Sequence, residues 1–307
     1  MTETDTKHNQ FIKFSVLMAI YSGTKKEYLI QALQSVINQT RPADEHVLII
    51  DGPLTPDVDD LINRLSTSKL LNGLKIVRIP TNLGLGNALH EGIKECSGDF
   101  ILRMDDDDIS VKNRFQQHYD AIVAHPQTDV FGGQILEFSS VNRPTIRRVP
   151  LQHREIKRWM GLRNTMNHVT VCMRRKAVLS AGNYDKKIAG GFEDYELWQR
   201  MLAAGFRFTN SEEPLAYVRF DFSQLQRRSG LKYLIEELRV HFSFFRQRQI
   251  SLAVFLVSAN IRIFFRLAPL CVLVRTYKLL MRQQPDNQAT VDFDDTFGQS
   301  RTGRDER

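Results

Sequence analysis

The 307-residue sequence contains little cysteine and no long apolar stretch that is free of charged residues. Its three cysteines, Cys96, Cys172 and Cys271, are odd in number and far apart, with no paired spacing. This pattern is typical of reduced, buried residues in a cytoplasmic protein, and it argues against a disulfide framework or a metal-binding cysteine cluster. The first ten residues are polar and have no apolar signal core, so they give no indication of export.

Positive charge is concentrated in one part of the chain. Between Arg227 and Arg282 there are eleven Lys and Arg residues against two Glu residues, a balance of +9. Because the whole chain carries +7, the remainder carries −2. The basic character therefore belongs to a single carboxy-terminal segment, and its function has to be sought there.

This segment has helical spacing, and its longest apolar run, 252–274, is interrupted by Arg262 and Arg266 and broken by Pro269. A spanning helix would bury both arginines, at about 2.5–3.5 kcal/mol each near the bilayer centre. We therefore expect helices that lie in the interface of an anionic membrane, with the arginines contributing to binding. An ordinary helical cap on the preceding domain is the alternative.

Strand-like and helix-like segments alternate four times in the first 125 residues. Apolar strand-type runs occupy 14–21, 46–50, 74–79 and 100–104, and helical spacing of apolar residues follows each of them. This alternation predicts an α/β fold with a mostly parallel central sheet and helices on both faces. Side chains at the carboxyl ends of the strands, such as Asp51 and Asp105, are expected to converge on one crevice.

Four consecutive carboxylates, Asp105 to Asp108, follow the last of these strands. Like charges packed so closely repel one another, so they need either a compensating cation or a solvated site. The run ends at Ser110, a good N-cap before an amphipathic helical pattern. Strand, carboxylates and helix together favour a site for a hard divalent cation with oxygen ligands. A solvated turn is the alternative, and Asp108 alone also suits a helix N-terminus.

Taken together, the motifs resemble those of the family-2 inverting glycosyltransferases, which have the GT-A fold. They are Ser15–Tyr21, Gln39–Pro42, Asp51-Gly52, Asn82–Gly86, Arg103–Asp108 and Gly191–Tyr195, in the family's order. Asn167–Val171 and Arg227–Gly230 are similar to the narrower group of bacterial exopolysaccharide and O-antigen transferases of the amylovoran type. The resemblance covers roughly residues 14–282.

On the donor side, the resemblance implies that Asp105 and Asp107 form an Asp-x-Asp pair. Asp107 would be the direct ligand of Mn²⁺ or Mg²⁺, and Asp105 would lie near the ribose or the metal. The family usually has a small residue between the pair, whereas this chain has Asp106, which leaves the assignment among Asp106, Asp107 and Asp108 open.

The nucleotide contacts are also implied by the resemblance. Asp51 would accept a hydrogen bond from the uracil N–H, which makes UDP the expected nucleotide, and Asn82 and Gly84 would shape the nucleotide pocket. For Asp51 the alternative is a strand-to-turn residue before Gly-Pro. The family's arginine is absent from Ala88-Leu89-His90, so that contact is not carried over.

On the acceptor side, an inverting transfer needs a base that removes the proton from the attacking hydroxyl. The match to the family's Glu-Asp pair makes Asp194 the expected base, and Glu193 its neighbour or a donor-sugar contact. Simple negative charge at a helix N-terminus is the alternative.

Four further residues are weaker candidates for substrate binding. Asn167 and His168 precede a predicted short strand at 169–173. They lie in a region that faces the donor sugar or the acceptor in the resembling transferases, although an isolated histidine is usually structural. Arg227 and Arg228 would steady the diphosphate, or else form a solvated basic turn.

The predicted organisation is a flexible N-terminus at 1–12, a catalytic domain at 13–226, a basic amphipathic helical segment at 227–284 and a disordered tail at 285–307. The predicted protein is a metal-dependent hexosyltransferase, with galactose as a candidate sugar. It uses a UDP-sugar donor and a polyprenyl-diphosphate-linked acceptor in bacterial surface polysaccharide biosynthesis. We expect a peripheral protein on the cytoplasmic face of the inner membrane, with no nucleic-acid partner.

Two other classes of function have to be weighed. A sugar nucleotidyltransferase also joins an α/β sheet to a metal, but it would want a Gly- and Arg-rich loop after the first strand, which Tyr21-Ser22-Gly23-Thr24 does not supply. A non-enzymatic basic module that binds membranes or nucleic acid would explain the carboxy-terminal charge. It would leave Asp105–Asp108 and Glu193-Asp194 without a use.

Overall fold

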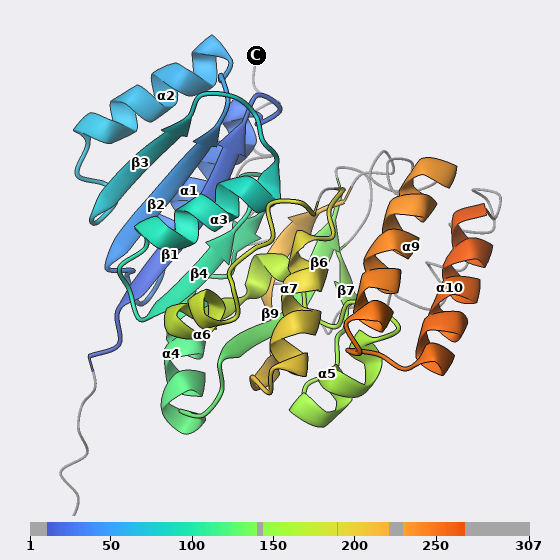
Figure 1. Cartoon of the computed structure of the whole chain (residues 1–307). Coiled ribbons are helices and arrows are strands. Elements are labelled where there is room, and N and C mark those ends of the chain that lie inside the picture. The colour runs from blue at the N-terminus through green and yellow to red at the C-terminus, as the bar shows by residue number, and fades with distance from the viewer. Residues whose placement is uncertain (1–10, 140–143, 189, 221–229, 268–307) are drawn as a thin grey trace, which may run out of the picture.

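The computed structural model describes residues 11–139, 144–188, 190–220 and 230–267 (Figure 1). Residues 1–10, Arg227, Arg228, Cys271 and the predicted tail 285–307 lie outside this part of the chain. Cys96 and Cys172 are buried free thiols, as predicted.

The first half of the chain forms the parallel part of the sheet. Its strands are β1 (Phe14–Tyr21), β2 (Glu45–Asp51), β3 (Leu74–Ile79) and β4 (Phe100–Met104), and they pair in parallel in the order β3-β2-β1-β4. The helices between them are α1 (Lys26–Ile37), α2 (Pro56–Thr67) and α3 (Leu85–Glu95). These elements confirm the predicted alternation.

The second half makes the sheet mixed. Its strands are β5 (Ile109–Ser110), β6 (Val130–Phe138), β7 (Thr145–Arg147), β8 (Cys172–Arg174) and β9 (Phe208–Arg219). β8 lies antiparallel between β4 and β6, and β9 runs parallel to β6. β5 pairs antiparallel with β9, and β7 pairs antiparallel with β6. The prediction of a mostly parallel sheet therefore holds for the first half only.

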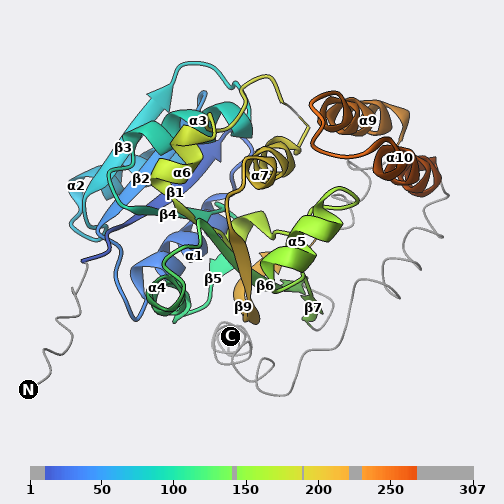
Figure 2. The same ribbon diagram turned by 60° about the horizontal axis from the view of Figure 1, so that its bottom comes forward.

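Helices cover both faces of the sheet, as expected (Figure 2). Apolar residues of α1, α2 and α4 (Arg114–Ala124) share one core with alternate residues of β1, β2 and β4. The opposite core joins α3, α5 (His153–Met160), α6 (Arg175–Ser180) and α7 (Glu193–Ala203). Trp198 of α7 is fully buried in this second core.

Two local predictions are wrong. Ser110 is not a helix N-cap: it pairs with Ala216 in the short ladder between β5 and β9, and α4 begins at Arg114 after the cap residue Asn113. The long-range strand pairing wins over the local capping preference, so Asp108 does not lie at a helix N-terminus either. The expected strand at 169–173 is instead the 3₁₀ turn η1 (His168–Thr170) followed by β8.

The carboxy-terminal helices α9 (Leu231–Arg246) and α10 (Leu252–Leu267) pack beside α7, at the right of Figure 1. Val240 and Phe244 of α9 belong to the same core as Trp198. Within the described residues, no helix is long and apolar enough to cross a membrane.

The expectation that Arg262 and Arg266 face a membrane is wrong. Both arginines point inward to Glu237 of α9, with N–O distances of 3.1 Å for Arg262 and 2.8 Å for Arg266. Glu237 and Arg262 are both buried, and a buried charge requires an opposite partner. The two arginines of α10 therefore face the protein interior.

Candidate functional site

The carboxylates at the end of β4 are at most partly exposed. Asp105, Asp106 and Asp108 each contact a different part of the chain. Asp105 pairs with Arg103 of β4, and Asp106 accepts a hydrogen bond from the Thr24 hydroxyl in the turn after β1. Asp108 is buried and accepts the backbone N–H of Arg219, at the end of β9, at 2.9 Å. The cluster is thus built into the junction of three strand ends, which argues against a simple solvated turn.

Burial raises the proton affinity of this cluster. It raises the pKa of Asp106 to about 7, and the charges of Asp107 and Asp105 add to the effect. It raises the pKa of Asp107 to about 6, helped by Asp105, and it raises the pKa of Asp108 well above its usual value. Carboxylates in this state are stabilised as anions by a nearby cation.

Part of the expected compensating charge comes from the protein. Arg103 and Arg114 are both buried directly behind the acidic run, and Arg114 donates to the Arg103 carbonyl oxygen at 2.8 Å. The negative charge of Asp105 helps to raise the pKa of Arg103, which keeps this guanidinium charged despite its burial. Arg103 thus offsets part of the negative charge by pairing with Asp105, and Arg114 adds a second buried positive charge that interacts electrostatically with Asp105 and Asp108.

Glu193 and Asp194 open α7, as predicted, and both are buried. Asp194 accepts hydrogen bonds from Asn164 Nδ2 at 2.8 Å and from the Tyr195 backbone N–H at 2.7 Å. These two bonds fix the orientation of the Asp194 carboxylate. Burial, followed by the charge of Asp194, raises the pKa of Glu193 to about 7.

The acidic run Asp105–Asp108 and the pair Glu193-Asp194 influence each other electrostatically. Glu193 is influenced by the charges of Arg103 and Asp105 across the site. The buried Tyr184 ring is influenced by Asp105, Glu193 and Asp194 together, and burial is the main cause that raises its pKa. The end of β4 and the start of α7 therefore lie within electrostatic range of each other.

Asp51 ends β2, as predicted, and it organises the loop that follows β3. Its two carboxylate oxygens accept the backbone N–H groups of Leu83 and Gly84, each at 2.8 Å. Gly52 has a φ of +85°, and a Cβ at this position would lie 2.7 Å from the backbone nitrogen of Asn82. Asn82 is exposed and Gly84 caps α3, so the loop lies against the end of β2 with its outer side open.

Asn167 and His168 are held by contacts within the protein. Asn167 is buried and donates to the carbonyl oxygen of Gly133 at 2.9 Å. His168 Nε2 lies 2.8 Å from the Tyr184 hydroxyl, and its ring meets Trp198 edge-on at 5.9 Å. Burial lowers the pKa of His168 well below its usual value. Both residues therefore have structural contacts with residues around the site.

Sequence reasoning missed three residues of the site: Thr24, Arg103 and Tyr184. An arginine inside the apolar run Phe100–Met104 was a usable signal, because a buried cation needs an acidic partner nearby. Thr24 and Tyr184 reach the site through contacts with residues far away in the sequence, and nothing local marks them.

The acidic run fits a divalent cation that is shared with a ligand. Among the described residues, no three His, Cys, Asp or Glu side chains are placed to hold a metal by themselves. Mg²⁺-type ions often bind through one or two carboxylates and complete their shell with phosphate oxygens and water. Asp105 and Asp107, partly exposed and separated by one residue, provide a donor set of that kind.

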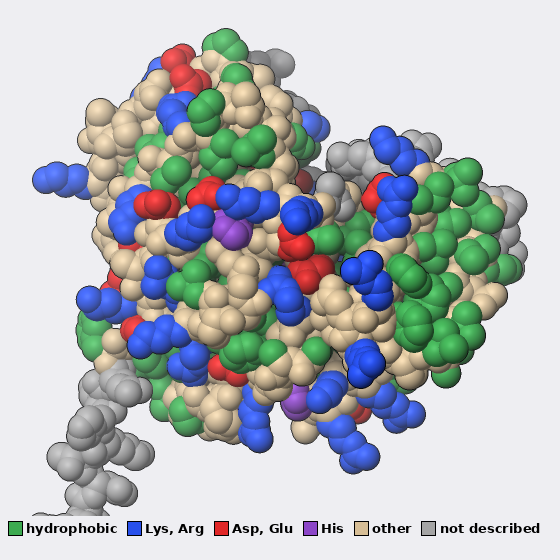
Figure 3. All heavy atoms as spheres, viewed as in Figure 1, with side chains coloured by type: hydrophobic (Ala, Val, Ile, Leu, Met, Phe, Trp, Pro, Cys, Tyr) green, Lys and Arg blue, Asp and Glu red, His purple; other side chains and the backbone are tan. Residues whose placement is uncertain are grey.

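Acidic side chains lie near the centre of the face shown in Figure 3, with Lys and Arg side chains close by. A broad hydrophobic area covers the α9–α10 side of the same face. The broad apolar area thus lies to one side of the acidic side chains on this face.

Comparison with known families gives a direct match. The family described as Glycosyl transferase family 2 matches residues 15–182. An uncharacterized glycosyltransferase of Haemophilus influenzae is 36% identical over 274 residues, which covers 89% of this chain and 100% of that protein. The amylovoran biosynthesis glycosyltransferase AmsE of Erwinia amylovora is 34% identical, covering 74% of this chain and 84% of the relative.

A third relative is the Escherichia coli UDP-Gal:alpha-D-GlcNAc-diphosphoundecaprenol beta-1,3-galactosyltransferase, 33% identical over 88% of this chain and 97% of its own. Among solved structures, residues 1–349 of Staphylococcus aureus TarS in complex with UDP-GlcNAc superimpose with a TM-score of 0.61 at 16% identity, covering 94% of this chain and 80% of that one. The Pyrobaculum calidifontis mannosyltransferase PcManGT, in complex with GDP-Man and Mn²⁺, gives 0.58 at 12% identity, covering 95% and 81%. The two structures share the fold.

Proposed function

Because this chain belongs to glycosyl transferase family 2, we propose that it transfers a sugar from a UDP-sugar to a lipid-diphosphate-linked saccharide, with inversion at the anomeric carbon. The observation that carries the proposal is that two acidic groups, the partly buried Asp105–Asp108 and the buried Glu193-Asp194, both interact electrostatically with Arg103 and Tyr184. An inverting transfer needs one acidic group for the leaving diphosphate and its metal, and another for the acceptor.

On the donor side, Asp107 and Asp105 are the proposed ligands of Mn²⁺ or Mg²⁺. The metal would neutralise the negative charge that develops on the leaving diphosphate. Asp51 remains the candidate acceptor for the uracil N–H, since each of its oxygens keeps a second lone pair beside its bond to the loop. Asn82 and Gly84 would form the wall of the nucleotide pocket.

On the acceptor side, Asp194 is the proposed base. The bonds from Asn164 and from the Tyr195 backbone hold its carboxylate in place, so that it accepts the proton as the acceptor hydroxyl attacks. Glu193, whose pKa is raised to about 7, would carry a proton below this pH and would donate a hydrogen bond to the donor sugar. Asn167 and His168 act indirectly, by supporting this region.

The substrates are proposed from the relatives. The printed name of the Escherichia coli relative gives UDP-Gal as donor and a GlcNAc-diphosphoundecaprenol as acceptor, and that of the Erwinia relative gives amylovoran biosynthesis. We extend the substrate class to this chain, with galactose as the leading donor sugar and bacterial surface polysaccharide as the product. A lipid-linked acceptor places the protein at the cytoplasmic face of the inner membrane, as a peripheral protein.

The test separates the two acidic groups. With Mn²⁺, a panel of UDP-sugars and a synthetic lipid-diphosphate acceptor, the wild type should form a glycosylated lipid that mass spectrometry detects. Asp107→Asn should weaken metal-dependent UDP binding and transfer. Asp194→Asn should lower turnover on the order of 10²–10⁴-fold while UDP binding is kept. Asp120→Asn, on the exposed side of α4, is the matched control.

Two outcomes would contradict the proposal. Full activity in excess EDTA would remove the metal from the mechanism. Near wild-type turnover of Asp194→Asn would remove Asp194 as the base.

A further inference from the structure

Helix α10 is built with its charges inside and its apolar side chains outside. The only charged residues in its 16-residue length are Arg262 and Arg266, and both pair with Glu237. Its exposed positions are apolar except for Asn260. They include Leu252, Leu256, Val257, Ile261, Ile263, Phe264 and Leu267, each at least 41% exposed. A helix exposed to water normally shows the reverse arrangement.

The rotation of α10 about its axis is fixed by polar contacts. Arg262 donates to the Ser258 carbonyl oxygen at 3.1 Å and approaches the Tyr195 hydroxyl of α7 at 3.5 Å, beside its ion pair with Glu237. Turning the apolar side inward would leave Glu237 buried without its cations, at a large free-energy cost. The apolar face therefore stays outward in the folded chain.

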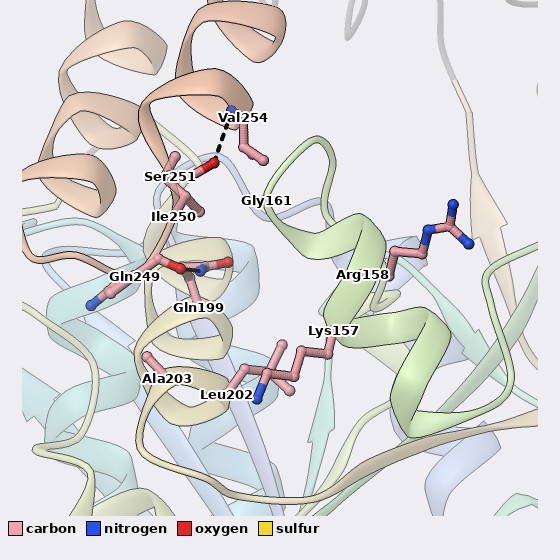
Figure 4. A pocket seen from close by; sticks show the side chains of 10 residues that line it. All are labelled: Lys157, Arg158, Gly161, Gln199, Leu202, Ala203, Gln249, Ile250, Ser251 and Val254. Atoms are coloured by element: carbon pink, nitrogen blue, oxygen red, sulfur yellow. Dashed lines mark hydrogen bonds between the residues drawn. The ribbon is translucent and has the colours of Figure 1, made fainter.

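The apolar face is bordered by basic and aromatic side chains. The end of α5 approaches the start of α10 closely: a Cβ at Gly161 would lie 3.0 Å from Val254. Together with α7 they enclose a cavity of about 220 Å³, lined among others by Lys157, Arg158 and Val254 (Figure 4). Trp159 is 41% exposed next to these two basic residues. Arg246 and Arg248 are exposed at the end of α9, and the apolar area is visible at the right of Figure 3.

We infer that the apolar face of α10 inserts into the surface of an anionic lipid bilayer, with the basic residues of α5 and of the end of α9 at the headgroups. A helix of this length, about 24 Å, lies in the interfacial plane with its apolar side at the acyl boundary. Lys and Arg at the rim match anionic headgroups, and an exposed tryptophan suits the same depth. A second copy of the chain fits less well, because a symmetric contact would bring two basic rims together.

This inference rests on the proposed function in one respect: the lipid-linked acceptor explains why the protein would contact a membrane. Insertion of the apolar side chains would drive membrane binding, whereas Arg262 and Arg266 fix the orientation of the helix through Glu237. The same contacts join the membrane face to the site, since Tyr195 follows Asp194 directly and also donates to the Met160 carbonyl oxygen of α5 at 2.5 Å. Inserted α10 would thus hold the acceptor side of the site at the bilayer surface.

The experiment uses the full chain and its own fluorescence. Of the two tryptophans, Trp159 is exposed near the face and Trp198 is buried. Vesicles of phosphatidylglycerol and phosphatidylcholine should shift the emission to shorter wavelength, and Trp159→Phe should abolish the shift. Val257→Glu should weaken vesicle binding by about tenfold or more. Val123→Glu is the matched control, because Val123 is a similarly exposed valine on helix α4 (59% against 51%).

Several results would overturn the inference: no vesicle binding by the wild type, equal binding by Val257→Glu, or a wild-type dimer in sedimentation that Val257→Glu dissociates while no vesicles bind. Melting curves of both valine variants check that they fold. A parallel assay with a water-soluble, short-chain acceptor separates the two proposals. Transfer without vesicle binding defeats this inference alone, and vesicle binding without transfer to any acceptor defeats the proposed function alone.

Discussion

The Glu193 side chain is almost completely buried at the start of α7. Its pKa rises from 4.5 to about 7, mainly through burial and then through the charge of Asp194. A carboxyl whose pKa is raised in the folded state binds its proton more tightly there than in the unfolded chain. Its contribution to stability is therefore full below pH 4.5 and is lost as the pH rises through about 7.

Replacing Glu193 by Gln removes this titration. Relative to the wild type, Glu193→Gln should become progressively more stable between pH 5 and pH 8, because only the wild type has to ionise a buried carboxyl. Urea unfolding of both proteins at each pH, without metal, measures the difference. A difference in unfolding free energy that stays constant across this range would show that Glu193 is not buried as an acid.

At the residue scale, sequence motifs predict the acidic residues that lie at the ends of strands and at the start of a helix. Asp51 and Asp105 lie at the carboxyl ends of β2 and β4, as the strand–helix alternation predicts. Asp194 lies in the first turn of α7, and its expected role came from the family resemblance. Arg103 and Thr24 were not found. Their roles depend on partners that only the folded chain brings together, such as Thr24 and Asp106, which are 82 residues apart.

The loop that follows β3 depends on a close backbone approach at Gly52. Both Gly52 and Gly205 have positive φ, +85° and +92°, but only a Cβ on Gly52 would collide with another backbone atom, Asn82 N at 2.7 Å. Alanine at either position should cost about 1–2 kcal/mol of stability for the left-handed conformation. Only Gly52→Ala should also weaken UDP binding, as measured by calorimetry. Equal UDP affinity in the two variants would show that the loop does not form the nucleotide pocket.

The orientation of α10 depends on a single buried carboxylate. Glu237→Gln should unpair Arg262 and Arg266 and lower the free energy of unfolding by about 3–5 kcal/mol. Its neighbour provides the control: Glu236 forms an exposed pair with Arg239 at 2.6 Å, and Glu236→Gln should cost under about 1 kcal/mol. Urea unfolding of the two variants measures both values. Similar losses would mean that Glu237 does not anchor α10.

At the scale of elements, the strands and helices of the first half were predictable because each is a local apolar pattern. The second half was harder, because its short strands are defined by their partners. Ser110 is of a residue type that favours a helix N-cap, yet it belongs to β5 because it pairs with Ala216 of β9. The two carboxy-terminal helices were predicted as helices, but the side on which Arg262 lies is decided by Glu237, which belongs to another helix.

At the scale of the whole molecule, the chain joins a parallel half, which ends in Asp51 and Asp105, to a mixed half, which carries Glu193 and Asp194. The proposed donor groups therefore lie at strand ends of the parallel half, and the proposed acceptor group lies at the start of helix α7. A base on the acceptor side, opposite a diphosphate on the donor side, permits direct displacement with the acceptor attacking from the far face of the sugar. The predicted consequence is inversion.

The anomeric configuration of the first product tests this account most directly. The wild type, an α-configured UDP-hexose and the lipid-diphosphate acceptor should give a product whose new linkage is β, as read from its anomeric proton by NMR during the reaction. An α-linked product would contradict the account, because it would require a different arrangement of the two acidic groups.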